Sequence, residues 1–272
     1  MNREFTHYVL TKFNIVASWY KDCAEQEGGR HTTKMFHTPE WLNERIRLFE
    51  AYCLPSVVNQ VAAFIWLVEF NSQSDRMLLD RIEVWKKQCP FLVPLFVEPY
   101  ADDAIVVRDY IAQHTSTDYV ITTNLDSDDM IHRDFLIKIQ KAFKHQDGQI
   151  IHYSSGLQYI EDRQILFSWQ NFGNHFYSYV EKSSSLPTTC VDIQHGKVNN
   201  YLEIGSHTEP GWIEIVHKCN VYNHAFVLKP VWYNTKLNFN VDLKINRLQF
   251  VKEYIQLNKR RIVTLFFRKR AQ

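Results

Sequence analysis

The stretch Tyr119-Val120-Ile121-Thr122-Thr123-Asn124-Leu125-Asp126-Ser127-Asp128-Asp129 decides the fold, because a hydrophobic run ends in a cluster of acids. Its β-branched and aromatic residues predict a buried strand. Three carboxylates within four residues repel one another unless a cation or hydrogen-bond donors compensate them. Ligands of open parallel α/β sheets bind at the carboxyl ends of the strands. The sequence therefore predicts a ligand site directly after this strand.

Strand-like and helix-like segments alternate on both sides of this stretch. Thr38-Pro39-Glu40 is a helix start, with a hydroxyl cap and a proline in the first turn, and Leu54-Pro55 is expected to end that helix. The expected strands are Tyr8–Val16, Ala63–Phe70, Phe91–Val97, Asp118–Leu125 and Gln149–Tyr153, and the further helices are Asp75–Gln88, Asp102–His114 and His132–Lys144. This alternation predicts an α/β fold whose central sheet is mainly parallel and carries helices on both faces.

The pattern is weaker after residue 153. Residues 154–212 are rich in Ser, Thr, Asn, His and aromatic residues, which indicates short strands and loops that shape a binding site. Ile213–Val216 and Ala225–Leu228 are expected to be short strands, and Ile245–Leu257 a terminal helix.

Composition excludes several classes of protein. The chain has 272 residues, 45% of them hydrophobic, and a net charge of +1, as expected for a folded globular protein. Its five cysteines are widely spaced without a CxxC pair, so a zinc ribbon or a disulfide framework is poorly supported. We expect a cytoplasmic protein, since no secretory signal or spanning segment is evident. Residues 244–272 carry nine Lys or Arg against one acid, which could contact an anionic membrane surface.

The acidic cluster has two interpretations. Asp126, Asp128 and Asp129 could hold Mg²⁺ or Mn²⁺ against diphosphate oxygens, where the ion would assist a leaving group. Alternatively, the cluster is an acidic turn that caps a helix beginning near His132. The hydrophobic strand before the cluster and its position within an α/β pattern favour the metal site.

Three segments carry a family resemblance. Thr123–Phe135, which contains the DSDD cluster, resembles the DxDD segment of GT-A-fold glycosyltransferases and is most similar to the rhamnosyltransferase family. Arg45–Glu50 with Leu54–Val57, and Gly211–Asn220, are similar to the same family. The resemblance implies a metal-dependent transfer of a hexose or deoxyhexose from a UDP- or dTDP-linked donor to a glycan, glycolipid or other hydroxyl acceptor. It also implies one GT-A-type catalytic domain over residues 1–240, with a nucleotide-sugar-binding half (1–130) and an acceptor-binding half (131–240), followed by a C-terminal helix and basic tail (241–272).

The resemblance assigns roles to particular residues. The residues implied for nucleotide-sugar binding are Thr11, Phe13, Asn14, Glu69, Arg108, Asn124 and Asp126. Arg108 could reach the diphosphate, because a guanidinium matches phosphate oxygens, or it could be a helix residue paired with Asp103 or Asp109. Asp126, Asp128 and His217 are the implied metal ligands, with Mn²⁺ or Mg²⁺ as cofactor, and Asp129 would contact the sugar or orient its neighbours.

The sequence also offers candidates for the catalytic base and for the acceptor surface. An inverting transferase needs a carboxylate as base, and the candidates are Glu209, which we prefer, Asp192 and Glu214. The aromatic stretch Phe167–Tyr179 is the candidate acceptor surface, since rings pack on sugar C–H groups and amides bind hydroxyls. Its candidate residues are Trp169 and Asn171, together with Trp212.

Two other functions compete with this prediction. A metal-dependent phosphohydrolase could use the same aspartates, but the chain lacks GxxxxGK[ST], GxGxxG and DxDx[TV] motifs. A non-catalytic sugar- or nucleotide-binding module is the second alternative. Nucleic acid is not an expected partner, because no recognition motif accompanies the basic tail.

Overall fold

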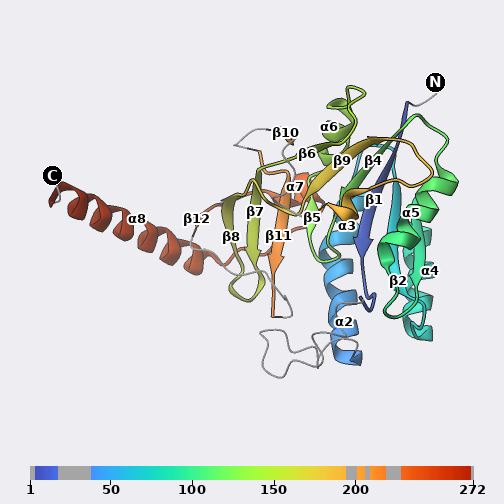
Figure 1. Cartoon of the computed structure of the whole chain (residues 1–272). Coiled ribbons are helices and arrows are strands. Elements are labelled where there is room, and N and C mark those ends of the chain that lie inside the picture. Colours follow the sequence, from blue (N-terminus) through green and yellow to red (C-terminus); the bar gives the residue numbers. More distant parts are fainter. Residues whose placement is uncertain (1–3, 18–37, 194–200, 206–208, 219–227, 271–272) are drawn as a thin grey trace.

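The computed structural model describes residues 4–17, 38–193, 201–205, 209–218 and 228–270, with side chains except those of Asp192 and of residues beyond Lys259. It contains two β-sheets, helices packed around the larger sheet, and a long C-terminal helix that projects away from the body (Figure 1). Three residues of the predicted strand Ala225–Leu228, 225–227, lie outside the described residues.

The larger sheet has seven strands in the order β10-β6-β9-β4-β1-β2-β3. Its strands are β1 (Phe5–Lys12), β2 (Ile65–Asn71), β3 (Leu92–Val97), β4 (Tyr119–Asn124), β6 (Gln149–His152), β9 (Tyr177–Lys182) and β10 (Tyr201–Glu203). Strands β1 to β4 are mutually parallel, whereas β9 runs antiparallel between β4 and β6. The predicted α/β class with a mainly parallel central sheet is therefore confirmed.

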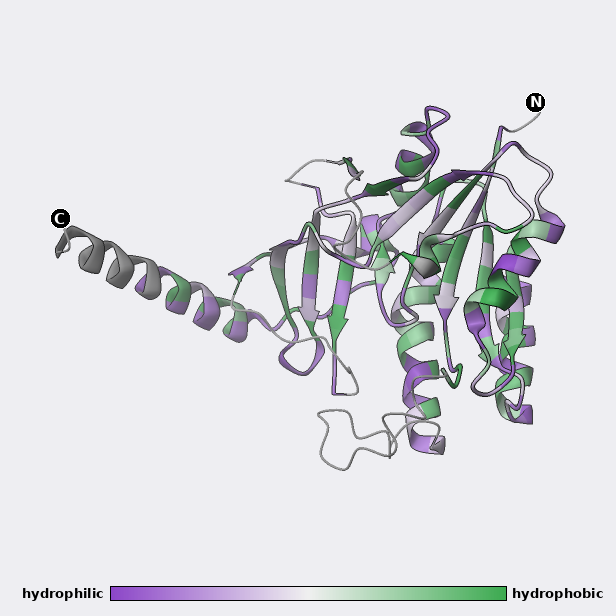
Figure 2. Ribbon diagram, in the orientation of Figure 1, coloured by the Kyte–Doolittle hydropathy of each residue, from purple (hydrophilic) through white to green (hydrophobic). Residues whose placement is uncertain are grey.

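Both faces of this sheet are covered. One face packs on α2 (Pro39–Leu48), α3 (Leu54–Val58), α4 (Arg76–Gln88) and α6 (Phe135–Lys141) through a core that includes Phe49, Trp66, Trp85 and Phe135. The other face packs on α5 (Asp103–His114) and the short helix η4 (Cys190–Asp192). Strands buried on both faces are nearly continuous apolar runs, so hydropathy predicted β2 as Ala63–Phe70, whereas β9 and β10 were not predicted; Figure 2 shows the hydropathy of each residue.

The helix that starts at Thr38 does not end at Pro55. The Thr38 side chain accepts a hydrogen bond from the Trp41 amide at 3.2 Å, which confirms the predicted cap. A π-helix, η2 (Phe49–Cys53), then leads directly into α3. Pro55 lies in the first turn of α3, where a missing amide proton costs little, so the expected end at Leu54-Pro55 was wrong.

The smaller sheet contains five strands in the order β12-β8-β7-β11-β5. They are β5 (Met130–Ile131), β7 (Ser155–Ile160), β8 (Ile165–Gln170), β11 (Trp212–Val216) and β12 (Lys229–Pro230). Because β5 follows the acidic cluster directly and pairs with β11, this sheet holds the carboxyl-terminal side of the cluster.

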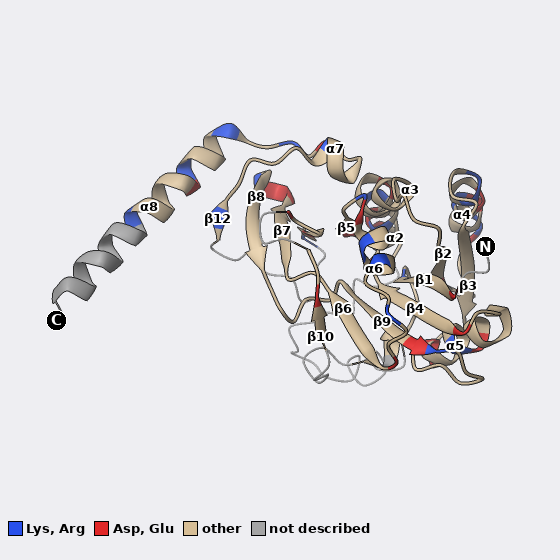
Figure 3. Ribbon diagram, turned by 90° about the horizontal axis from the view of Figure 1, so that it is seen from above, with Lys and Arg blue, Asp and Glu red and all other residues tan. Residues whose placement is uncertain are grey.

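Helix α8 (Arg247–Arg270) leaves the body next to β12, and basic residues are distributed along its described part (Figure 3). Its first turns contact the body through an ion pair between Arg163 and Glu253 and through the rings of Trp232 and Phe250. Leu248, Val251 and Ile255 are exposed. None of the described helices has the length and apolar character that crossing a membrane requires.

Candidate active site

The acidic cluster follows β4 at the carboxyl end of the parallel strands. Its Leu125 amide donates to the Leu10 carbonyl at 3.0 Å, and this bond fixes the cluster beside the end of β1. Asp126 is exposed, whereas Asp128 and Asp129 are buried. The next helix, α6, begins only after β5, with Asp134 at its N-cap. The cluster is therefore not the cap of a helix near His132, and the alternative interpretation of the sequence was wrong.

Asp128 is held by two basic side chains that come from distant parts of the chain. Its Oδ2 lies 2.8 Å from His217 Nε2, at the end of β11, and 3.2 Å from a terminal nitrogen of Arg45 on α2. Burial alone would raise the pKa of the Asp128 carboxyl, but Arg45 and His217 hold it below its usual value. Asp128 is therefore an ionised carboxylate in a buried position.

Asp129 joins the two sheets. Its Oδ1 accepts the Ile215 amide of β11 at 2.8 Å, and its Oδ2 lies 2.7 Å from His175 Nε2, two residues before β9. Burial would lower the pKa of His175, but the carboxylates of Asp126 and Asp129 raise it to about 9. His175 is thus a cation at neutral pH, and it also lies 3.7 Å from Asp126.

Glu214 approaches the same cluster from β11. Its side chain is buried and accepts a hydrogen bond from Gln158 of β7 at 2.9 Å. Burial raises the pKa of Glu214 to about 7; Gln158 and His175 lower it, whereas Asp126 and Asp128 raise it. A carboxyl group that titrates near neutral pH beside the cluster is suited to acid–base chemistry.

The predicted metal ligands fall into two neighbouring groups. Asp128 and His217 form one pair. Asp126 belongs to the other, with Asp129 and His175, whose ligand atoms lie within 4.8 Å of one another. The donor chemistry suits a hard divalent ion, because both groups offer carboxylate oxygens and an imidazole nitrogen. Joint coordination by Asp126, Asp128 and His217 remains a prediction.

Two of the residues predicted to bind the nucleotide, Asn14 and Glu69, lie near the ends of β1 and β2. Glu69 is completely buried, and burial raises its pKa to about 8; Lys12, its register partner on β1, lowers that pKa and forms an ion pair with Asp103. Asn14 accepts the Asn71 amide at 3.0 Å and so connects the ends of the two strands.

The other predicted nucleotide-binding residues have internal partners. Thr11 accepts a hydrogen bond from the Trp66 indole at 2.9 Å, and Phe13 packs in the core against Phe49, Phe70 and Trp85. The side chain of Asn124 donates to the His175 carbonyl at 3.0 Å, so it positions the histidine. Arg108 Nε donates to the Ala104 carbonyl at 3.2 Å, within its own helix. Contacts between these four side chains and a nucleotide remain predictions.

The predicted acceptor residues form part of an aromatic row that begins at the cluster. The ring of His175 lies 4.1 Å from that of Phe176, which stacks on Trp212 at 4.6 Å, and Trp212 contacts Trp169 at 5.5 Å. Trp212 is completely buried, so it can only support the neighbouring rings and cannot itself contact an acceptor, whereas Trp169 is half-buried. Asn171 accepts the Gly173 amide at 3.0 Å and shapes the loop before His175.

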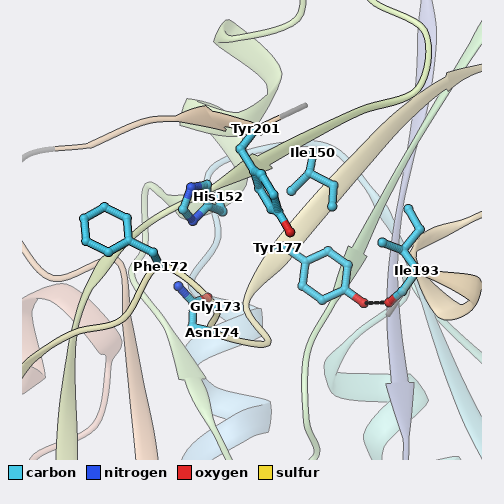
Figure 4. A pocket seen from close by; sticks show the side chains of 8 residues that line it. All are labelled: Ile150, His152, Phe172, Gly173, Asn174, Tyr177, Ile193 and Tyr201. Carbon is cyan, nitrogen blue, oxygen red and sulfur yellow. Dashed lines mark hydrogen bonds between the residues drawn. The ribbon is translucent and has the colours of Figure 1, made fainter. Parts of the chain in front are cut away.

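A shallow pocket lies beside this loop (Figure 4). The ring of Tyr201 lies between His152, the last residue of β6, which it contacts edge-to-face, and Tyr177, the first residue of β9, and Phe172 lies at the rim of the pocket. The Tyr177 hydroxyl donates to the carbonyl of Ile193 at 3.0 Å. Because Gly173 and Asn174 line the pocket and His175 follows them, the pocket and the acidic cluster share one loop.

Of the three candidate bases, Glu214 is beside the cluster. Glu209 instead lies 2.7 Å from Lys138 and 3.7 Å from His132, and its hydrogen bond to Lys138 lowers its pKa. Asp192 belongs to η4, but its side chain is outside the described residues.

Reasoning from the sequence missed two residues of the site, Arg45 and His175. Arg45 lies in the segment Arg45–Glu50, which resembles the rhamnosyltransferase family, and His175 lies in the aromatic stretch Phe167–Tyr179. Only the contacts of Arg45 with Asp128 and of His175 with Asp129 show their roles.

Comparison with known proteins agrees with this geometry. The model of a family described as "Putative rhamnosyl transferase" matches residues 6–229, which include the cluster, Arg45, His175 and His217. The chain belongs to this family. The expected family is thus confirmed, and with it the α/β fold of the GT-A type that the resemblance implied. No curated protein sequence matches the chain.

Solved structures show only distant similarity. The first 349 residues of TarS from S. aureus, solved with UDP-GlcNAc, are 9% identical with a TM-score of 0.47, and the match covers 81% of this chain and 61% of TarS. A "putative nucleotide-diphospho-sugar transferase" from Desulfovibrio desulfuricans is 12% identical with a TM-score of 0.36, over 78% of this chain and 80% of that one. The chain thus spans about three fifths of the TarS fragment that it matches.

Proposed function

We propose that this chain is a metal-dependent glycosyltransferase that moves a hexose or deoxyhexose from a UDP- or dTDP-linked donor to a glycan, glycolipid or other hydroxyl acceptor. The observation that carries the proposal is the buried pair Asp128–His217 at the carboxyl end of the central strands. This pair lies in a chain of the rhamnosyl transferase family, at the edge of the sheet where α/β proteins bind ligands.

The donor would lie across the ends of β1, β2 and β4. Lys12, whose side chain is exposed, would offer its ammonium group to the base or ribose there, and the buried Asn14 and Glu69 would support this edge from inside the fold. The diphosphate would then reach Asp126 and Asp128, as expected if residues 1–130 form the nucleotide-sugar-binding half.

Asp126, Asp128 and His217 would hold Mn²⁺ or Mg²⁺. Asp128 Oδ2 and His217 Nε2 lie 2.8 Å apart, and a carboxylate oxygen beside an imidazole nitrogen is a donor set that would suit either ion. When bound, the ion neutralises the charge that develops on the departing diphosphate. His175 is a weaker candidate ligand, because as a cation it has no free lone pair on Nε2.

Residues 131–240 would supply the acceptor side. We assign the acceptor to the loop of Asn171–His175 and its pocket, where Phe172 offers an exposed ring. Glu214 is the candidate base that we prefer, since its charge interacts with those of Asp126 and Asp128, whereas Glu209 is bound to Lys138. The carboxylate of Glu214 would take the proton of the acceptor hydroxyl.

We also propose a cytoplasmic location with peripheral membrane contact through α8. The exposed side chains of Leu248, Val251 and Ile255 lie on a helix whose sequence is strongly basic, and such helices bind anionic bilayers. Sedimentation with vesicles that contain anionic lipid, compared with neutral vesicles, tests this contact.

Calorimetry with UDP- and dTDP-sugars, with and without Mn²⁺, tests the proposed activity, and slow donor hydrolysis identifies the sugar. We expect nucleotide binding that needs the metal and is lost in Asp128→Ala. Nucleotide binding that ignores both the metal and this substitution would contradict the mechanism. Binding of the nucleotide sugar without any transfer or hydrolysis would favour a non-catalytic module. Release of inorganic phosphate would favour a phosphohydrolase.

A further inference from the structure

Arg45 reaches the acidic cluster from α2, 83 residues away in sequence. One terminal nitrogen donates to Asp128 Oδ2 at 3.2 Å, and the other donates to the hydroxyl of Ser127. The guanidinium lies 5.8 Å from the ring centroid of Trp41, and the side chain is only 17% exposed. Its position is therefore fixed by both polar and aromatic contacts.

The oxygen that Arg45 contacts is the one that a metal ion would use. Asp128 Oδ2 accepts from Arg45 and also faces His217 Nε2 at 2.8 Å. A guanidinium keeps its charge at every physiological pH, so its presence disfavours a second cation on the same buried oxygen. Arg45 thus compensates the charge of Asp128 in the absence of an ion.

One nitrogen of the Arg45 guanidinium lacks an acceptor. Its Nε is buried and has no hydrogen-bond partner within the described part of the chain. A buried donor without an acceptor is costly, and phosphate oxygens are the acceptors that the guanidinium fork matches best. This unsatisfied group indicates an anionic ligand next to Asp128.

We propose that Arg45 makes metal binding depend on the nucleotide. Without a donor, Arg45 neutralises Asp128 and weakens ion binding. When a diphosphate enters, Arg45 pairs with its oxygens and Asp128 becomes available to the ion. This inference rests on the proposed function, because it needs a nucleoside diphosphate at the cluster.

Direct titration of Mn²⁺, followed by electron paramagnetic resonance of the free ion, tests this coupling with and without UDP. The wild type should bind Mn²⁺ weakly alone and at least tenfold more tightly with UDP. By reciprocity, Mn²⁺ should strengthen UDP binding by the same factor. Arg45→Gln should bind Mn²⁺ alone more tightly than the wild type, and its affinity for UDP should fall about tenfold.

A second variant of Arg45 tests whether the charge of the guanidinium or its fork of donors is needed, and a variant of Arg47 is the control. Arg45→Lys keeps the charge but loses the fork, so Mn²⁺ binding alone should stay weak while UDP binding falls. Arg47→Gln is the matched control on the same helix, because Arg47 pairs with Glu44 and Glu161 and should leave both affinities unchanged. Melting curves of all variants report whether they fold.

The outcomes are distinguishable. A wild type that binds UDP and Mn²⁺ with the same coupling as a folded Arg45→Gln overturns this inference alone. A wild type that binds no nucleotide under any condition overturns the proposed function and this inference with it.

Discussion

One carboxylate, that of Asp129, connects the two sheets: its Oδ2 lies 2.7 Å from His175 Nε2 and its Oδ1 accepts the Ile215 amide at 2.8 Å. His175 precedes β9 of the larger sheet, and Ile215 belongs to β11 of the smaller one. The Asp129 carboxylate is therefore one of the contacts that hold the two sheets together, along with the stacking of Trp212 on Phe176.

Removal of this carboxylate should destabilise the fold. Asp129→Ala leaves His175 and the Ile215 amide without their acceptor, and we expect the free energy of unfolding to fall by about 3 kcal/mol. Urea denaturation measures the change. Asp126→Ala removes an exposed carboxylate from the same turn and should have a much smaller effect; equal effects would contradict the connecting role of Asp129.

Stability should also fall at alkaline pH. The pKa of His175 is about 9 in the folded state, above its value of about 6.5 in an unfolded chain. The imidazolium therefore stabilises the fold fully below pH 6.5, and this contribution is lost as the pH rises through 9. Melting temperatures between pH 6.5 and 9.5 should decline in the wild type and change less in His175→Gln. Parallel declines in both proteins would assign the pH dependence to another group.

Transfer activity should rise with pH through about 7, where Glu214 loses its proton. Glu214→Gln should lower kcat by about 10²–10⁴ and flatten the pH profile, since the amide cannot act as a base. Glu209→Gln is the matched control and should change kcat little, because Glu209 contacts Lys138. The opposite result, a large loss only in Glu209→Gln, would restore the base that the sequence favoured.

The contact between Gly156 and Trp212 leaves no room for a side chain. A Cβ at position 156 would overlap with the indole ring, which is held by Phe176. We expect Gly156→Ala to lower the free energy of unfolding by about 1–3 kcal/mol in thermal or urea melts. Gly173→Ala, whose Cβ would meet nothing closer than 3.8 Å, should be tolerated; similar losses in both variants would contradict this explanation.

The first half of the fold could be predicted because its signals are local. Strands β1 to β4 are apolar runs, and Thr38, Asp75 and Asp102 cap their helices with their own side chains. In the smaller sheet, β11 was expected as Ile213–Val216, but β7 was not predicted, because it buries polar residues such as Gln158, whose partner Glu214 is 56 residues away. Burial of a paired polar group removes the hydropathy pattern on which such predictions depend.

In the candidate site, too, features with a local signal in the sequence were predicted, and contacts between distant residues were harder to predict. The cluster itself is local, since an acidic run follows a strand. The family resemblance had named His217 together with Asp128, 89 residues away, but no pattern in the sequence connects Asp128 with Arg45, 83 residues away. A single sequence shows which residues have suitable chemistry, but only tertiary packing brings them together.

The antiparallel strand β9 has a consequence for how the protein is made. Residues 1–130 contain β1 to β4, but one edge of β4 pairs only with β9, at residues 177–182. A nascent chain that has not yet reached β9 exposes this edge, and exposed strand edges template aggregation. We therefore expect that fragments ending before Tyr177 do not fold as independent units, and that the part of the sheet within residues 1–130 is completed only after β9 has been synthesised.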